Sequence, residues 1–168
     1  MRAVRVVRED GPEALRLEDI PEPESELVVA VRAAGVSFPD LLMTRGLYQL
    51  RQELPFTLGW EAAGDVVRAP ADSPVREGQA VMTLSFGAHA ELVAADRQTT
   101  FPLPEGLSYE EGAALPLNYL TALAALERRG GLRPGETVLV HGAAGGAGTA
   151  TIQVAKALGA RVIAAVST

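Results

Sequence analysis

The chain has 168 residues, a formal net charge of −6, no cysteine and a hydrophobic fraction of 48%. This length suits one domain, or one domain and part of another, with enough apolar side chains to bury a core. The negative charge, with no basic cluster, excludes a nucleic-acid backbone as the main partner. The lack of cysteine excludes disulfides, thiolate metal sites and thiol nucleophiles, and fits a cytoplasmic protein.

No segment of the sequence suggests a membrane span or a secretory signal. The first ten residues lack the apolar run of a secretory signal. The longest uncharged stretch, from Thr137 to Ala155, contains four glycines together with His141 and Gln153. A glycine-rich loop explains this stretch better than a bilayer span does, so we expect a soluble protein without a membrane partner.

Up to about residue 100 the sequence predicts short strands separated by turns that contain glycine or proline. The expected strands cover residues 3–7, 15–18, 27–35, 59–67, 80–84 and 88–93. The near-continuous apolar run at 27–35 predicts a strand that is buried on both faces. One short helix is expected between Pro39 and Gly46, since proline suits a first helical turn and glycine a C-terminal cap. Together these elements predict a barrel-like β domain.

Helical patterns replace the strand patterns after residue 107. Ser108 and Glu111 have the spacing of a capping box, which predicts a short helix. A second helix is expected from Pro116 to about Arg129, with Asn118 and Thr121 on one of its faces.

The most informative stretch is TVLVHGAAGGAG, residues 137–148. A predicted strand is followed at once by a glycine-rich turn and then by helical spacing. Ala147, Ala150, Val154 and Leu158 are expected on one buried helix face. A second strand at 161–166 should lie parallel to the first.

Strand, glycine-rich turn and helix open a dinucleotide-binding unit. Glycines let a pyrophosphate approach the main chain, and the free N–H groups at the helix start bind the anion. The strict GxGxxG pattern is absent, because Ala143 stands at its first position and the spacing is Gly142-x-x-Gly145-x-x-Gly148. A tight turn that only packs a helix against a strand is the alternative interpretation.

Five segments distributed along the chain resemble the medium-chain dehydrogenase/reductase superfamily, and within it the zinc-free quinone oxidoreductase (zeta-crystallin-like) branch. They are VSFPD at 36–40, RGLY at 45–48, LGWEAAG at 58–64, LNYLTA at 117–122 and VHGAAGGAG at 140–148. The resemblance implies an α/β fold: a GroES-like, β-barrel-type catalytic domain at 1–115, then the start of a Rossmann-type nucleotide-binding domain at 116–168. It also implies NADPH as the hydride donor.

The resemblance assigns cofactor-binding positions residue by residue. The pyrophosphate turn corresponds to Ala144, Gly145, Gly146, Ala147 and Gly148. Other positions lie near the nicotinamide or the adenosine ribose in this family, and here they are Ser37, Tyr48, Thr121 and Ser167. Ser37 departs from the asparagine of many members, and Leu42 from the tyrosine of some. No acidic residue ends the strand at 161–166, which favours NADPH over NADH.

No metal site is expected. Zinc-dependent relatives use cysteine and histidine ligands, whereas this chain has no cysteine and carries Trp60 where the histidine would stand. His89 and His141 are predicted on separate strands. Asp40 and Glu61 are carboxylates in matching motifs, but a structural role as cap or ion-pair partner is favoured over a catalytic one. No residue is assigned as catalytic.

The glycine-rich turn and the family resemblance together imply an oxidoreductase that transfers a hydride from NADPH to a quinone or activated alkene, without zinc. The alternatives are an enoyl-thioester reductase of the same superfamily and a truncated, non-catalytic binding or structural module. Because only two strands and one helix of the nucleotide-binding domain are present, the chain by itself need not be active. We expect a homo-oligomer or a missing C-terminal portion that covers Val138, Val140, Ile163 and Val166.

Overall fold

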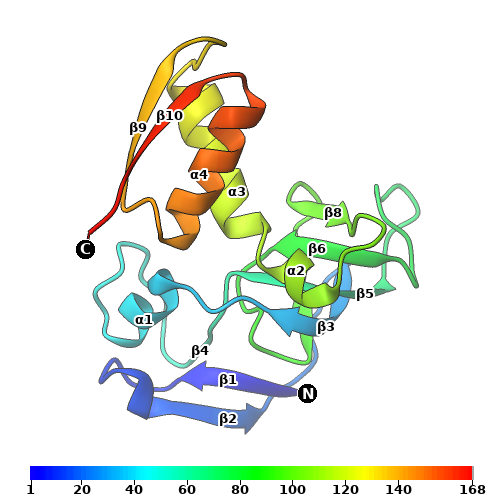
Figure 1. Cartoon of the computed structure of the whole chain (residues 1–168). Coiled ribbons are helices and arrows are strands. Elements are labelled where there is room, and N and C mark those ends of the chain that lie inside the picture. The colour runs from blue at the N-terminus through cyan, green and yellow to red at the C-terminus, as the bar shows by residue number, and fades with distance from the viewer. Residues whose placement is uncertain (168) are drawn as a thin grey trace. The chain divides into compact units, whose positions relative to one another are not determined.

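The computed structural model describes residues 1–167 and divides into two compact units, Met1–Pro116 and Leu117–Thr168. The first unit holds all the antiparallel strands and two short helices (Figure 1). Its elements are β1 (Arg2–Val6), η1 (Pro12–Ala14), β2 (Leu15–Asp19), β3 (Val28–Ala34), α1 (Phe38–Thr44), β4 (Phe56–Thr57), β5 (Glu61–Arg68), β6 (Ala80–Leu84), β7 (Leu92–Ala94), β8 (Thr100–Pro102) and α2 (Tyr109–Ala113).

Two sheets make up this first unit. One has five strands in the order β7-β3-β5-β6-β8, and the other has three in the order β2-β1-β4. An antiparallel bridge between Ala3 and Ala90 joins them. The result confirms an α/β chain that begins with a β-rich domain.

Two details of the strands differ from the prediction. The expected strand at 88–93 is shorter and starts only at Leu92, because the preceding residues turn to pair with Leu58 and Gly59 instead. In β3 only Val28 and Val29 are buried, whereas Arg32 is exposed and binds Asp65. Burial on both faces therefore holds only for the start of that strand.

Helix α1 begins and ends as its sequence predicts. The carboxylate of Asp40 accepts hydrogen bonds from the backbone N–H and the hydroxyl of Ser37, the N-cap residue. At the other end Gly46 adopts φ +62°, and the N–H of Leu47 donates to the Leu42 carbonyl. This pattern is a Schellman motif, which only a residue without a β-carbon forms without strain.

Helix α2 is attached to the five-stranded sheet by one carboxylate. The Tyr109 hydroxyl donates to Asp65 Oδ1 at 2.6 Å, and Arg32 Nε donates to Asp65 Oδ2 at 2.8 Å. The hydrogen bond from Tyr109, followed by the one from Arg32, lowers the pKa of Asp65. The same contact with Asp65 raises the pKa of Tyr109. The capping box of Ser108 and Glu111 forms as predicted at the start of α2.

The second unit consists of two helical segments and a parallel strand pair. Its elements are α3 (Pro116–Leu123), a π-helical turn η2 (Ala124–Arg129), β9 (Thr137–His141), α4 (Gly146–Ala157) and β10 (Arg161–Ala165). The helix expected from Pro116 to Arg129 thus forms, but its second half is widened into π geometry. β9 and β10 pair in parallel, with Leu139 opposite Ile163.

A small apolar core joins the helices of this unit. Ala122, Ala150 and Val154 are buried together, and Tyr119 and Leu126 pack against them. The Tyr119 hydroxyl also donates to Gln153 Oε1 at 2.7 Å, which ties α3 to α4. None of the helices in the described residues combines the length and apolar character needed to cross a lipid bilayer.

Candidate functional site

The loop between β9 and α4 carries the predicted pyrophosphate turn. β9 ends at His141, and Gly142 then takes φ +62°, a conformation that favours glycine. Ala143 is buried, and its N–H donates to the carbonyl of Ala165 at 3.1 Å, which holds the loop against the end of β10. The turn therefore lies at the carboxyl end of both parallel strands, where open α/β sheets bind ligands.

The glycines of the loop serve different physical needs. A β-carbon on Gly148 would collide with the Gly142 carbonyl oxygen and lie 2.7 Å from Ala143 Cα, so Gly148 permits close packing of α4 on the loop. A β-carbon on Gly145 would meet only the Gly142 oxygen, at 3.4 Å. One on Gly146 would meet the side-chain amide of Asn118 at 3.0–3.3 Å. Close packing within the loop thus explains why residue 148 is a glycine, but it does not explain the glycine at position 145.

The buried face of α4 differs by one position from the prediction. Ala150 and Val154 are buried as expected, but Ala147 is exposed. Gly148 and Ala155 complete the buried side instead. The hydrophobic pattern did not predict this shift of the buried face, because Gly148 has no apolar side chain and yet makes the closest contact.

The backbone amides at the start of α4 are suited to binding an anion. Gly145 is the N-cap residue, and its own N–H donates to the Gly142 carbonyl at 3.0 Å. The first bond of the helix runs from the N–H of Thr149 to the Gly145 carbonyl at 2.8 Å. The N–H groups of Gly146, Ala147 and Gly148 hold the first three helical positions, which have no acceptor inside an α-helix. With the positive end of the helix dipole, they fit a phosphate group.

Three further predicted residues belong to the second unit. The Thr121 hydroxyl donates to the Leu117 carbonyl one turn earlier at 2.6 Å, so its oxygen retains only acceptor capacity. Ala144 is exposed in the loop between β9 and α4, and Ser167 is exposed just beyond β10.

Ser37, a predicted site residue, is bonded to Asp40 at the start of α1. Asp40 is 2% exposed, and its Oδ2 accepts from the Ser37 hydroxyl at 2.6 Å and from the Ser37 N–H at 2.7 Å. Asp40 therefore caps α1, the structural role that the sequence favoured. The single hydroxyl proton of Ser37 is committed to Asp40, so Ser37 can only accept a hydrogen bond from a ligand.

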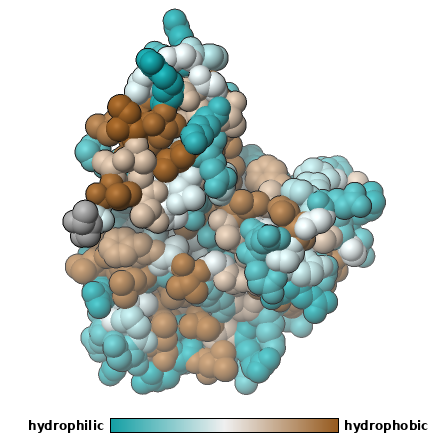
Figure 2. Space-filling model, viewed as in Figure 1, coloured by the Kyte–Doolittle hydropathy of each residue, from teal (hydrophilic) through white to brown (hydrophobic). Residues whose placement is uncertain are grey.

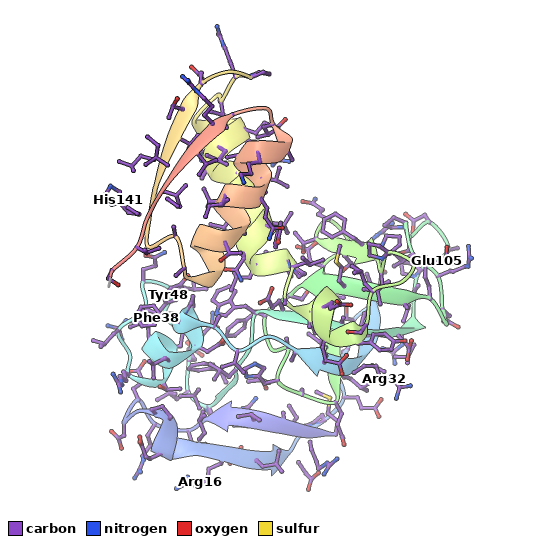
Figure 3. All side chains as sticks on the ribbon, in the orientation of Figure 1. Arg16, Arg32, Phe38, Tyr48, Glu105 and His141 are labelled. Carbon is purple, nitrogen blue, oxygen red and sulfur yellow. The ribbon has the colours of Figure 1, made fainter. Side chains whose placement is uncertain are left out.

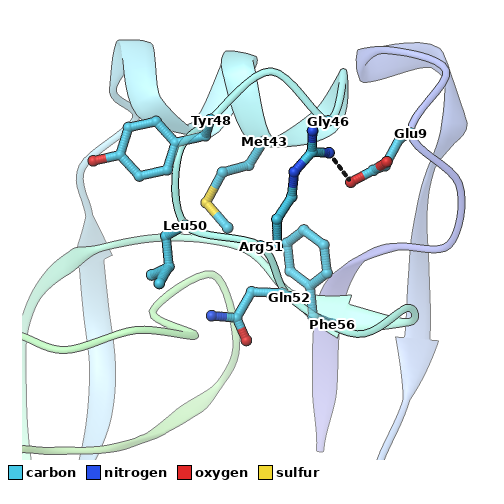
Figure 4. A pocket seen from close by; sticks show the side chains of 8 residues that line it. All are labelled: Glu9, Met43, Gly46, Tyr48, Leu50, Arg51, Gln52 and Phe56. Carbon is cyan, nitrogen blue, oxygen red and sulfur yellow. Dashed lines mark ion pairs between the residues drawn. The ribbon is translucent and has the colours of Figure 1, made fainter.

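Tyr48 lies in a row of aromatic rings. It meets Trp60 edge to face at a centroid distance of 5.8 Å, and Trp60 meets Phe86 at 5.1 Å. Tyr48 also lines a small hollow with Met43 and Phe56, and its hydroxyl points away from the Arg51–Glu9 ion pair at the other end (Figure 4). Phe38, the first residue of α1, is 69% exposed (Figure 3).

The residues considered for metal binding have other surroundings. His89 lies in a loop rather than on a strand, and its Nε2 is 2.8 Å from the Gly35 carbonyl oxygen. His141 is the exposed last residue of β9, as expected. Glu61 is buried at the start of β5, against Gly35. Within residues 1–167 no cluster of three or more His, Asp or Glu side chains is arranged to hold a metal ion.

One face of the β9–β10 pair is apolar and exposed. Leu139 and Ile163 are 54% and 56% exposed, and hydrophobic residues gather over these strands in Figure 2. Val166, just beyond β10, is 60% exposed. Val140 was expected on the exposed face, but it is buried at 6%, and Val138 is half-buried. The side chains alternate along the strand, and Leu139 takes the exposed position.

Comparison with known proteins agrees with this architecture. Residues 23–105 match the family model of the alcohol dehydrogenase GroES-like domain. The quinone oxidoreductase of Rattus norvegicus is 40% identical over 171 residues, which cover 97% of this chain and 52% of that protein. The quinone oxidoreductase-like protein 2 of Bos taurus is 45% identical over 148 residues, covering 86% of this chain and 42% of that protein.

Solved structures show the same fold over the whole chain. A probable oxidoreductase from Mycobacterium abscessus is 49% identical with a TM-score of 0.89, and the match covers 100% of this chain and 56% of that one. The quinone oxidoreductase of Thermus thermophilus, also solved in complex with NADPH, is 46% identical with a TM-score of 0.85, covering 100% and 54%. The chain thus spans about half the length of these relatives. It belongs to the medium-chain dehydrogenase/reductase superfamily, where its relatives include quinone oxidoreductases.

Proposed function

We propose that this chain supplies the catalytic GroES-like domain, at 1–115, and the first part of the nucleotide-binding domain, at 116–168, of a zinc-independent oxidoreductase. Its activity is the transfer of a hydride from NADPH to a quinone or an activated alkene. The observation that carries this proposal is the start of α4 at the carboxyl end of two parallel strands, where the amides of Gly146, Ala147 and Gly148 have no acceptor inside the helix.

NADPH supplies a hydride when it is bound, and the protein orients it. The amides of residues 146–148 would hold the diphosphate, and Gly145 leaves its approach open because no β-carbon stands there. Ala144 belongs to the same turn. Ser167 follows β10, where the adenosine ribose would lie. No acidic residue ends β10, a position where a carboxylate would favour NADH by binding the ribose 2′-hydroxyl.

Ser37, Tyr48 and Thr121 are each proposed as contacts of the nicotinamide or the acceptor, because each corresponds to such a position in the family. The hydroxyls of Ser37 and Thr121 each donate within the protein, so both accept hydrogen bonds from a ligand. Tyr48 carries the hydroxyl suited to donate to the oxygen of a reduced acceptor, where negative charge develops. Quinones and activated alkenes accept a hydride without a Lewis acid. This fits a chain that has Trp60 in place of a ligating histidine and no cysteine.

We propose a cytoplasmic location, because a chain without cysteine cannot form the disulfides that are common in secreted proteins. The proposed small-molecule partner is the quinone or enone itself. A second copy of the chain, or a C-terminal portion, is proposed to cover the exposed face of Leu139 and Ile163.

Binding and turnover test the proposal separately. NADPH fluorescence should change on titration of this chain, and a Gly146→Glu variant, which places a carboxylate at the start of α4, should bind at least about tenfold more weakly. The longest gene product that contains the sequence should oxidise NADPH with 1,4-benzoquinone faster than with crotonyl-CoA. No binding would favour a non-catalytic module, and faster turnover with crotonyl-CoA would favour an enoyl-thioester reductase.

A further inference from the structure

Two buried polar atoms of the first unit make no hydrogen bond and have complementary chemistry. Within residues 1–167, three buried side-chain nitrogen or oxygen atoms make no hydrogen bond, namely Arg5 Nε, Asp40 Oδ1 and Trp60 Nε1. Arg5 Nε lies 3.8 Å from the carboxylate of Glu18, so an opposite charge faces it. The other two are a carboxylate oxygen, which accepts, and an indole N–H, which can only donate.

Asp40 is almost completely buried, and only one of its two oxygens is satisfied. The residue is 2% exposed, and its Oδ2 accepts both hydrogen bonds from Ser37. Its Oδ1 lies inside the protein without a donor from any described residue. Burial of a carboxylate oxygen without a donor is costly, so this atom points to a small ligand that supplies one.

The fold brings Asp40 and Trp60 to the same part of the first unit. The N–H of Gly35, just before α1, donates at 3.1 Å to the carbonyl of Glu61, the residue that follows Trp60. One turn after Asp40, Met43 is buried in an apolar cluster against which Trp60 also packs. Contacts before and after Asp40 in the chain thus lead to the surroundings of Trp60.

The ligand between these two atoms must accept from an N–H group and donate to a carboxylate oxygen. A cation would suit Oδ1 but could not accept from the indole, and an anion would suit Nε1 but would be repelled by the carboxylate. A water molecule does both, and buried waters typically make about three hydrogen bonds to polar groups that are otherwise unsatisfied. The chemistry of the two atoms therefore selects water.

We propose that one internal water molecule accepts a hydrogen bond from Trp60 Nε1 and donates one to Asp40 Oδ1. Asp40 thereby acts as a positioning residue for the indole ring, which meets Tyr48 edge to face at 5.8 Å. The water site is independent of the proposed function. Only its effect on a bound acceptor, through Tyr48, rests on that function.

The single tryptophan of the chain makes the test specific, because its indole N–H gives one signal in the NMR spectrum of the nitrogen-labelled chain. We expect a cross-peak between this signal and the water frequency in a nitrogen-edited NOESY spectrum. The cross-peak should have the opposite sign in a ROESY spectrum, as a long-lived bound water gives. Asp40→Asn keeps the shape of the side chain but replaces an acceptor with an N–H donor, so the indole signal should shift upfield and its cross-peak should weaken.

Two control variants separate water from other exchanging protons. Ser37→Ala removes a donor to Oδ2 of the same carboxylate and leaves Oδ1 in place. Tyr48→Phe removes the exchangeable hydroxyl of the ring that contacts the indole. The cross-peak between Trp60 and water should persist in both variants.

Three results would overturn the proposal. The absence of a cross-peak in the unaltered chain would show that no long-lived water binds the indole. A cross-peak that is lost in Ser37→Ala or in Tyr48→Phe would come from a hydroxyl proton. An indole signal that stays in place in Asp40→Asn would show that Asp40 does not position Trp60. None of these measurements uses NADPH, so a failure of the water site is distinct from a failure of the proposed function.

Discussion

A β-carbon on Gly148 would occupy the space that the carbonyl oxygen of Gly142 fills. The two glycines lie at opposite ends of the predicted turn, and Gly148 is buried in the first turn of α4. This contact sets how closely the helix approaches the end of β9. The position of the backbone amides of residues 146–148 depends on this close approach.

Gly148→Ala should destabilise the chain, because the new methyl group must displace backbone atoms rather than a flexible side chain. We expect a loss of about 1–3 kcal/mol in the free energy of unfolding, as for other overpacked sites. Urea unfolding followed by circular dichroism measures it. An unchanged midpoint would mean that the loop yields freely and does not position α4.

Gly145→Ala should separate binding from folding. Gly145 has φ −78° and ψ 169°, which alanine adopts without strain, and the nearest atom to a new β-carbon is 3.4 Å away. Stability should therefore stay within about 0.5 kcal/mol. NADPH affinity should fall, because the methyl group stands where the diphosphate approaches the main chain. Calorimetric titration checks this, and unaltered affinity would contradict the assigned role of Gly145.

The hydrogen bonds of Asp65 predict a pH dependence of stability. The pKa of Asp65 is lowered in the folded chain, so ionised Asp65 stabilises the fold above its ordinary pKa of 3.8. That contribution is lost as the pH falls through the lower, folded-state value. The stability difference between the unaltered chain and Asp65→Asn should be largest near pH 7 and should shrink below about pH 4. Urea midpoints at pH 7, 5 and 3 test it, and a difference that is constant with pH would contradict it.

Short-range signals in the sequence predicted much of this fold. Pro39, Asp40 and Gly46 define α1, and Ser108 with Glu111 defines the start of α2, because caps depend on neighbouring residues. The glycine turn and its flanking strands were recognisable for the same reason.

What the sequence could not predict depends on packing between distant segments. Period-two alternation separates Val138 and Val140 from Leu139, but only the position of α4 decides which side is covered. Asn118 was visible as a polar residue on the face of Thr121, yet its approach to Gly146 arises from the packing of α3 on α4. Local sequence signals therefore could not predict the contact between Asn118 and Gly146.

A closed chain of hydrogen bonds crosses the core beside β6 and β8. Thr100 donates its hydroxyl to the Asp96 carbonyl at 2.6 Å, so Thr83 must donate to Thr100 and Ser85 to Thr83. The Asp96 N–H completes the chain by donating to Ser85. Thr83 is fully buried, so its hydroxyl cannot be replaced by water without rearrangement.

Thr83→Val keeps the shape of the side chain and should cost about 1–3 kcal/mol, because buried hydroxyls lose their partners. Thr137→Val is the control at an exposed strand position and should change stability by less than about 0.5 kcal/mol. The denaturation midpoints of both variants, measured in urea, test this prediction. Equal midpoints for the two would show that the hydroxyl chain contributes nothing.

The exposed face of β9 and β10 predicts self-association of this chain. Leu139 and Ile163 are paired in register and are both more than half exposed. Replacing both with threonine, which also suits strands, should shift the mass from light scattering toward the monomer. Leu17→Thr, at an equally apolar position that is 68% exposed in the first unit, should not. A chain that is already monomeric at working concentration would contradict this prediction.

Backbone amide NMR of the nitrogen-labelled chain during NADPH titration tests the central claim most directly. The account predicts that the N–H resonances of Gly146, Ala147 and Gly148 shift downfield on binding, as amides that gain a phosphate acceptor do, whereas Thr149, already bonded to the Gly145 carbonyl, shifts much less. NADPH binding that leaves these three amide resonances in place would contradict it.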